Sequence, residues 1–292
     1  MIVVKFFISF LLIVISFGCA KAQVVKQSKP GATKNATGEK PIDLSRYFEN
    51  TTGAIVIYDA KNNRYIRYNE KRCATRFTPA STFKIPNALI GLETVAVKDA
   101  ESVIAWDKKK YPEDNWTSEP FVHWKQDHTL RSAMKYSVVW YFREIARRIG
   151  ERRMKDYLER FEYGNRDISG GLSSERMFEA FWLSGTLKIS ADEQIDFLRK
   201  FYDGKLPVSK RSTEIVKQIL VQEATLDYKL SAKTGGGWKD GKALGWFVGY
   251  LETKDNRYFF ALNLDGENYA AIRDKRIDLT KQILNELGFM KK

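Results

Sequence analysis

Cysteine and histidine are scarce in this sequence. Its 292 residues include only 2 Cys and 2 His. Cys19 lies at the end of an apolar N-terminal stretch that export would remove, so Cys73 would have no partner for an internal disulfide. His123 and His128 are five residues apart, a spacing that does not place them on one helix face. We therefore exclude a disulfide scaffold and expect no metal site built on Cys or His.

Acidic residues are fewer than basic ones. The chain carries 49 Lys and Arg against 36 Asp and Glu, which gives a net charge of +13. The densest basic run, residues 146–160, is interrupted by acidic residues at helical spacing, which is typical of a solvated helix face. The charge therefore indicates at most an attraction to anionic surfaces, and we expect no nucleic-acid partner.

Hydrophobic runs long enough to span a bilayer are absent after the N-terminus. Residues 1–22 have the charged, apolar and small-residue order of a secretory signal, with the apolar part at 6–17. This order predicts cleavage after Ala22, export to the periplasm and no stable membrane insertion. The alternative is lipid attachment at Cys19. N-terminal sequencing of the exported protein would distinguish a start at Gln23 from a lipid-modified cysteine.

Residues 23–41 lack periodicity and predict a flexible linker, which leaves residues 42–292 as a single domain. With 43% hydrophobic and 13% aromatic residues, this domain can bury a sizeable core. Strand patterns lie at both of its ends and helical patterns in its middle. We therefore predict an α+β fold, with a central antiparallel sheet flanked by helices and an inserted helical region. The predicted strands cover residues 53–59, 64–69, 229–233, 244–252 and 257–265, and a closing helix covers residues 275–287.

Ser81 and Lys84 form a candidate nucleophile and base at a predicted helix start. Thr78 could cap this helix, and Pro79 would occupy its first position. A spacing of three residues then places Ser81 and Lys84 on one face. A serine hydroxyl becomes a good nucleophile only when a base takes its proton, and a lysine whose pKa is lowered by burial can be that base.

A second Ser-x-x-Lys pattern, from Ser132 to Lys135, shows that the spacing alone is a weak signal. This pattern lies inside what reads as one continuous helix over residues 129–142, with no cap before it. We therefore interpret Ser132 as structural.

Two further patterns follow Ser81 along the chain. Ser137-Val138-Val139 alone is typical of an apolar helix. Lys233-Thr234-Gly235 ends a predicted strand and precedes Gly236-Gly237, so it supplies a cation, a hydroxyl and a backbone that a ligand can approach closely. Alone, this pattern would more often be a turn.

In this order, the patterns resemble those of the serine β-lactamase and penicillin-binding protein superfamily, in which the nucleophilic serine opens Ser-x-x-Lys and a Lys-Thr-Gly strand lies downstream. The details resemble class D, the oxacillinase-type β-lactamases. Class D order is followed by Ser137-x-Val139, Tyr163-Gly164-Asn165, Phe181-Trp182-Leu183 and Gly245-Trp246-Phe247-Val248-Gly249. The resemblance implies an enzyme that hydrolyses the β-lactam amide of penicillin-type antibiotics. It also implies no cofactor, with carbon dioxide or bicarbonate needed only to modify a lysine.

The resemblance also implies roles for individual residues. Ser81 is the nucleophile, and Lys84, carboxylated on its side-chain nitrogen, is the general base for acylation and deacylation. Trp182 would hold the carbamate through its indole N–H, and Ser137 with Lys233 would pass a proton to the leaving nitrogen. The implied substrate-binding residues are Val139, Leu183, Thr234, Gly235, Gly236 and Arg276, and the backbone N–H groups of Ser81 and Gly236 would form the oxyanion hole.

Some alternatives stay open. Arg273 is the alternative to Arg276 as partner of the substrate carboxylate. Gly236-Gly237 replaces a bulkier residue that is common after Lys-Thr-Gly, which could loosen the substrate rim. Cys73 resembles a structural cysteine and has no expected catalytic role. The rival functions are a penicillin-binding transpeptidase or carboxypeptidase and a β-lactam sensor domain that stays acylated. A homodimer is possible.

Overall fold

The computed structural model describes residues 43–112, 116–172 and 176–290. The predicted signal peptide, residues 1–22, and the predicted linker, residues 23–41, lie outside the described residues. In the part of the chain that is described, no helix is both long and apolar enough to cross a membrane.

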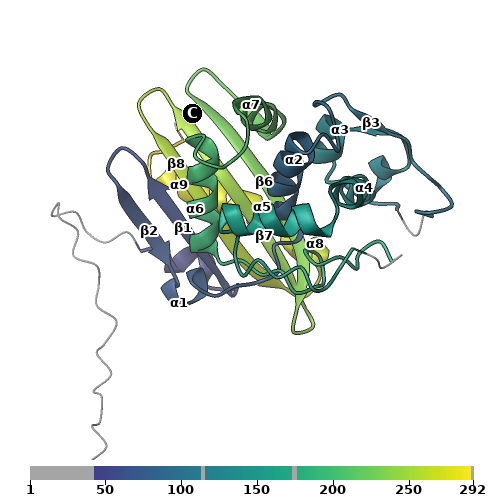
Figure 1. Ribbon diagram of the computed structural model, residues 1–292. Coiled ribbons are helices and arrows are strands. Elements are labelled where there is room, and N and C mark those ends of the chain that lie inside the picture. The colour runs from purple at the N-terminus through teal and green to yellow at the C-terminus, as the bar shows by residue number, and fades with distance from the viewer. Residues whose placement is uncertain (1–42, 113–115, 173–175, 291–292) are drawn as a thin grey trace, which may run out of the picture. The chain divides into compact units, whose positions relative to one another are not determined.

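A six-stranded antiparallel sheet crosses the centre of the domain in the order β2-β1-β8-β7-β6-β5 (Figure 1). This sheet confirms the predicted α+β architecture. Its strands are β1 (Gly53–Asp59), β2 (Arg64–Tyr68), β5 (Val221–Ala224), β6 (Tyr228–Lys239), β7 (Lys242–Thr253) and β8 (Arg257–Gly266). A separate two-stranded sheet pairs β3 (Val103–Ile104) with β4 (His128–Thr129).

Both faces of the sheet are covered, which is why β1 is buried along its whole length. Alternate residues of a strand point to opposite faces. Val56 therefore belongs to the cluster that contains Phe197 of α6 (Ala191–Tyr202), whereas Ile57 belongs to the cluster that contains Ile283 of α9 (Lys275–Glu286). The sheet thus separates two hydrophobic cores.

The inserted helical region lies between β2 and β5 in sequence and packs beside the sheet (Figure 1). Its central helix, α2 (Lys84–Glu93), contacts α4 (Val139–Ile149) and α7 (Lys210–Ile219). The other helical elements of the described chain are η1 (Ser45–Phe48), α1 (Glu70–Cys73), η2 (Ala80–Phe83), η3 (Phe121–Trp124), α3 (Leu130–Lys135), α5 (Glu151–Phe161) and α8 (Tyr269–Arg273).

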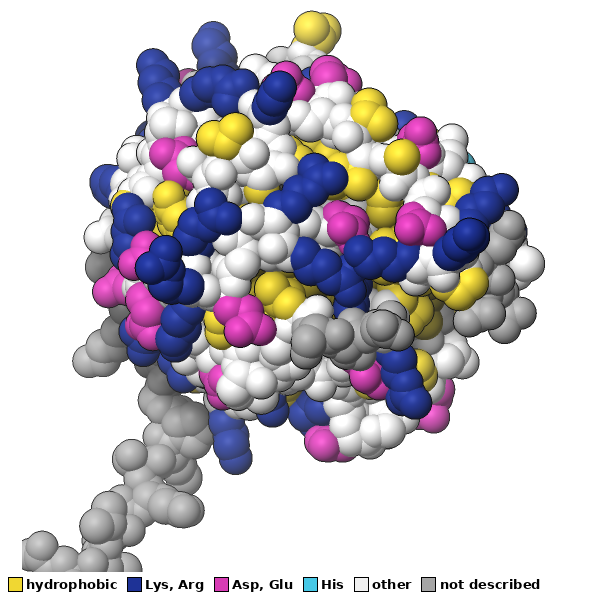
Figure 2. Space-filling model, turned by 45° about the vertical axis from the view of Figure 1, so that its right-hand side comes forward, with side chains coloured by type: hydrophobic (Ala, Val, Ile, Leu, Met, Phe, Trp, Pro, Cys, Tyr) yellow, Lys and Arg dark blue, Asp and Glu magenta, His cyan; other side chains and the backbone are white. Residues whose placement is uncertain are grey.

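Basic and acidic side chains are interspersed on the surface in Figure 2. The basic run predicted as one helix face is divided at Gly150, whose φ of +79° separates α4 from α5. On α5, Lys155 pairs with Glu159 at 2.8 Å and Arg160 pairs with Asp156 at 3.3 Å. These pairs neutralise part of the basic run.

Two predicted segments differ from the structure. The helix expected over residues 129–142 is wrong, because α3 ends at Lys135 and α4 begins at Val139. The backbone of Ser137 between them has a φ of +56°, which an α-helix cannot accommodate. The strand expected to end at Lys-Thr-Gly is too short, because β6 continues to Lys239 and pairs with β7 along this stretch.

Candidate active site

Ser81 lies in η2, and Lys84 begins α2 directly after it. The Nζ atom of Lys84 donates a hydrogen bond to Oγ of Ser81 over 2.7 Å. Ser81 is half-buried, whereas Lys84 is 0% exposed. The structure therefore brings the predicted nucleophile and base into direct contact, with the hydroxyl on the more accessible side.

The predicted cap at Thr78 is wrong. The η2 turn has no side-chain cap, and Oγ1 of Thr78 instead donates to the backbone carbonyl oxygen of Trp182 over 3.1 Å. Ala80, the residue before the nucleophile, has a φ of +48°. A non-glycine residue in this conformation is strained and is held by its surroundings. Tertiary contacts to the segment around Trp182, rather than a local cap, therefore orient Ser81.

The environment of Lys84 favours its neutral form. Burial holds the pKa of the ammonium well below its usual value, and the nearby charge of Lys233 lowers it further. The Nζ atom lies 5.5 Å from the centre of the Phe142 ring. A neutral amine can accept a proton from Ser81 or react with carbon dioxide, which a protonated one cannot do.

Replacing Lys84 with Met should increase the free energy of unfolding by about 1 kcal/mol or more near neutral pH in bicarbonate-free buffer. The pKa of Lys84 is lowered only in the folded protein, so the unfolded chain binds more protons and wild-type stability rises with pH. The gain from Met should shrink as the pH approaches the usual lysine pKa. Urea unfolding of the wild type and the variant at about pH 7 and about pH 9 measures the gain in the free energy of unfolding at each pH.

Lys155→Met is the matched control, because Lys155 lies on the surface of α5 and pairs with Glu159. The Lys155→Met protein should show no gain in the free energy of unfolding that depends on pH. A Lys84→Met protein that is less stable than wild type at both pH values would contradict the destabilising burial of this lysine.

The second serine motif lies where α3 and α4 are separated. Oγ of Ser137 accepts a hydrogen bond from Nζ of Lys233 over 3.0 Å. Lys233 is 4% exposed, and burial together with the charge of Arg276 lowers its pKa to about 7. A lysine with this pKa can donate and regain a proton near neutral pH. The structure thus brings these two predicted residues into hydrogen-bond contact.

Ser132 has a different environment. Its Oγ lies 2.9 Å from Nδ1 of the buried His128 and accepts from the backbone N–H of Thr129 over 3.0 Å. Thr129 in turn caps α3, so the expectation of no cap before this helix is wrong. Both partners lie at the start of α3, which matches the structural interpretation of Ser132.

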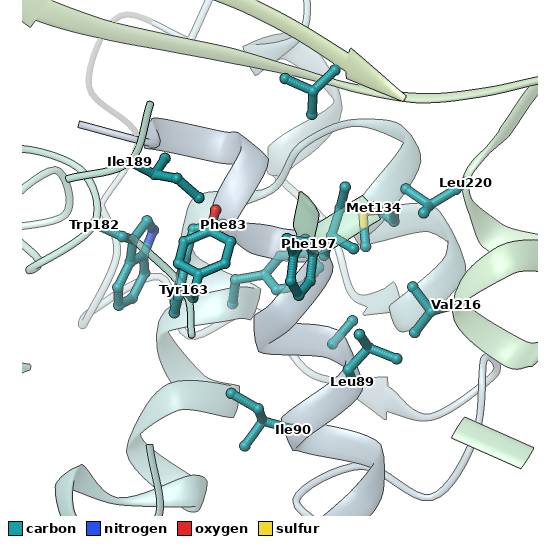
Figure 3. Packing of buried hydrophobic residues seen from close by; sticks show 14 of the residues in the cluster. Phe83, Leu89, Ile90, Met134, Tyr163, Trp182, Ile189, Phe197, Val216 and Leu220 are labelled. Carbon is teal, nitrogen blue, oxygen red and sulfur yellow. The ribbon is translucent and has the colours of Figure 1, made fainter. Parts of the chain in front are cut away.

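Trp182 is 0% exposed and stacks on Phe83 with the ring centres 5.3 Å apart (Figure 3). Its indole Nε1 is buried and has no hydrogen-bond partner among the described residues. An unpaired buried N–H is costly, and a native structure usually supplies an acceptor for it. This donor is thus available to a hydrogen-bond acceptor that enters the site.

A cavity of about 550 Å³ opens above Ser81. Of the predicted residues, Ser81, Ser137, Val139, Leu183, Thr234, Gly236, Arg276 and the alternative Arg273 line it. Lys84, Trp182, Lys233 and Gly235 do not line it. A second cavity, of about 650 Å³, borders Thr51 and Lys275 and contains none of the predicted residues.

The two candidate arginines differ in their surroundings. Arg276 is 3% exposed, and its Nη1 donates to the carbonyl oxygen of Gly235 on β6. The side chain of Arg273 is 40% exposed and pairs with Asp274 at 2.8 Å. A buried, fixed guanidinium is the better partner for a carboxylate in a cavity, because fewer water contacts and rotamers are lost on binding. The geometry therefore favours Arg276.

Cys73 is 0% exposed and lies outside this cavity. Burial raises the pKa of its thiol to about 12, and Sγ donates to the carbonyl oxygens of Tyr68 and Ile55 over 3.3 and 3.4 Å. A thiol that stays protonated is a poor nucleophile. Within the described ranges, no group of three or more His, Cys, Asp and Glu side chains could hold a metal ion.

No sequence motif points to several of the residues that complete the cavity. Aromatic side chains make up much of its wall and come from segments far apart in sequence. They are Phe121, Trp124, Phe178, Trp238 and Tyr269. Isolated aromatic residues are usually core residues, so only the structure assigns these five to the site.

Comparisons with known proteins agree with this geometry. Residues 48–287 match the family of the penicillin binding protein transpeptidase domain. The β-lactamase OXA-48 of Klebsiella pneumoniae is 44% identical over 234 residues, which are 80% of this chain and 83% of that protein. The regulatory protein BlaR1 of Bacillus licheniformis is 36% identical over 249 residues, which are 84% of this chain and 39% of that protein.

Solved structures of class D β-lactamases are also similar to this chain. The class D β-lactamase YbXI from Nostoc has a TM-score of 0.76 and 35% sequence identity, with 85% of this chain and 100% of that one covered. The paired Ser81 and Lys84, the buried Lys233 and these similarities lead to one conclusion. The chain belongs to the class D serine β-lactamases, within the family of penicillin-binding protein transpeptidase domains.

Proposed function

We propose that this protein hydrolyses the β-lactam amide of penicillin-type antibiotics through an acyl-enzyme on Ser81. The observation that carries the proposal is the 2.7 Å contact between Nζ of Lys84 and Oγ of Ser81 at the floor of a ligand-sized cavity. Loss of its proton lets Oγ attack the β-lactam carbonyl carbon. The carbon–nitrogen bond then breaks, and water later cleaves the ester to release the product and free Ser81.

Lys84 is proposed to act as a carboxylated lysine. Three features support this: the lowered pKa of the buried amine, the apolar side chains of Val139 and Leu183, and the unpaired indole N–H of Trp182. Carboxylation would turn the amine into an anionic base that can take a proton from the Ser81 hydroxyl and later from the hydrolytic water. Trp182 is the residue proposed to hold this group.

Other residues are proposed to act on the leaving group and the substrate. Lys233 and Ser137 would pass a proton to the β-lactam nitrogen as it leaves, because their 3.0 Å contact forms a path between a titrating amine and a hydroxyl in the cavity wall. Thr234 and Arg276 would bind the carboxylate of the antibiotic. The backbone N–H groups of Ser81 and Gly236 would stabilise the oxyanion.

Acylation without turnover is the alternative, as in a transpeptidase or a sensor domain. The similarity to the regulatory protein BlaR1 is the observation that favours this alternative. The buried donor of Trp182, which suits an anionic base for deacylation, favours hydrolysis.

Counting product molecules separates these functions. Purified protein should convert many equivalents of a penicillin per active site, and acyl-enzyme should not build up to full occupancy. A burst of one equivalent, followed by a stable adduct in the intact-mass spectrum, would support the sensor or transpeptidase and contradict hydrolysis.

A further inference from the structure

The glycines after Lys-Thr-Gly do not leave an open rim. A Cβ atom added to Gly236 would lie 2.7 Å from Cε2 of Tyr269, closer than real side chains approach one another. The aromatic ring therefore rests directly on the backbone of β6, in the space that a side chain at position 236 would fill. The expectation that Gly236-Gly237 loosens the substrate rim is wrong at Gly236 for this reason.

Tyr269 reaches this position from the start of α8, where Asn268 caps the helix. Its hydroxyl accepts a hydrogen bond from Nη2 of Arg276 over 3.4 Å, and the guanidinium carbon of Arg276 lies 5.5 Å from the ring centre. The ring centre of Phe121 is 6.1 Å from that of Tyr269. Tyr269 thus contacts Arg276 and links β6 to the η3 wall of the cavity.

We propose that Tyr269 is a specificity-determining residue and a positioning residue for Arg276, matched to the glycine at position 236. This inference rests on the proposed function for its substrate, a β-lactam whose carboxylate binds Arg276. The ring lines the cavity next to Arg276, the proposed partner of that carboxylate. The ring occupies the space that a side chain at position 236 would fill. The position of the ring therefore requires a glycine at position 236.

The position of Tyr269 determines which part of the substrate it meets. In penicillins and cephalosporins the carboxylate is carried by the ring fused to the β-lactam. A group on the neighbouring ring carbon must lie near whatever surrounds the carboxylate site. Penicillins have two methyl groups there, whereas many cephalosporins have a larger substituent. Tyr269 should therefore restrict the larger cephalosporins more than penicillins.

A double-mutant cycle tests the match between the two residues. Gly236→Ala should lower the second-order rate constant of acylation by a penicillin about tenfold or more, because the added methyl group collides with the ring. In the Tyr269→Ala background the same change should cost less than about threefold. In the Tyr269→Phe background the full loss should return, because Phe keeps the ring.

Gly237→Ala is the matched control. A Cβ atom at Gly237 would meet Thr78 at 3.1 Å and no atom of Tyr269 within 4 Å. Its effect should be the same with and without Tyr269, within about twofold. If Gly236→Ala is equally harmful in the wild-type and Tyr269→Ala backgrounds, the two residues are not matched and the inference fails.

Specificity gives a second readout. Tyr269→Ala should raise the acylation rate constant for a cephalosporin with a bulky substituent, relative to that for benzylpenicillin, by about tenfold. An unchanged ratio would contradict the proposed role. Because acylation is measured apart from turnover, coupling between the residues in a protein that does not turn over would refute hydrolysis but keep this inference. Turnover without coupling between the residues would support hydrolysis and refute this inference.

Discussion

Replacing Ser81 with Ala should abolish both hydrolysis of a penicillin and covalent labelling by it. The loss of kcat should be on the order of 10⁴-fold or more, because no other group can form the acyl-enzyme. The fold should survive, since the half-buried Ser81 side chain loses only its hydrogen bond from Lys84. Spectrophotometric hydrolysis and intact-mass spectra after incubation with the antibiotic measure the two effects.

Ser132→Ala is the matched control, because Ser132 opens the other Ser-x-x-Lys pattern of the chain. It should retain labelling and near wild-type hydrolysis, with a loss of stability of about 1 kcal/mol from the weakened cap of α3. An acyl adduct on the Ser81→Ala protein, or loss of labelling in the Ser132→Ala protein, would contradict the assignment of the nucleophile.

Replacing Trp182 with Phe should slow deacylation by about 10²-fold or more while slowing acylation less. Phe can keep the ring packing against Phe83 but cannot donate the buried N–H. Without that donor the carbamate on Lys84 should be lost more readily, so the variant should accumulate acyl-enzyme. Saturating bicarbonate should restore part of the rate. Stopped-flow acylation and the decay of the isolated acyl-enzyme give the two rate constants.

Trp106→Phe controls for the loss of an indole N–H as such. The Nε1 of Trp106 donates to the backbone carbonyl of Tyr111 over 3.0 Å, and Trp106 does not line the cavity above Ser81. Its deacylation should not respond to bicarbonate. If Trp182→Phe turns over normally and bicarbonate has no effect on it, Trp182 does not support a carbamate.

The strand β1 and the closing helix α9 could be predicted from the sequence because the patterns that indicate them are local. Strand β1 alternates between two buried faces and is bounded by turn residues, and the predicted range of 53–59 agrees with the structure. The closing helix has apolar residues at helical spacing and was predicted to within one residue of α9. A short apolar run bounded by turn residues predicts a strand such as β1, and apolar residues at helical spacing predict a helix such as α9, because burial shapes both patterns.

The site could be predicted only where chemistry leaves a motif. Ser81, Lys84 and Lys233 were found from short patterns in a fixed order. The positive φ of Ser137 was not, because its strained conformation is imposed by packing and not by local propensity. The predicted strand ends too early, at Lys-Thr-Gly, because the glycines after it interrupt the local strand pattern, although β6 continues through them.

The role of those glycines depends on residues far away in sequence. Gly235 lies against Pro79, where an added Cβ atom would be 3.0 Å from the carbonyl oxygen. Gly236 lies against Tyr269. Glycine is thus required on β6 by close approach and not by a bend. No local pattern connects these positions, so the length of β6 and the role of Tyr269 could only come from the structure.

The most direct test of the account is the response of the wild-type enzyme to bicarbonate. Hydrolysis of a penicillin should fall when bicarbonate is removed in acidic buffer, because acid breaks the carbamate and only the neutral amine of Lys84 can form it again. Activity should return when bicarbonate is added. If activity is the same with and without bicarbonate, Lys84 acts as a free amine, and a transpeptidase-like mechanism describes this protein better.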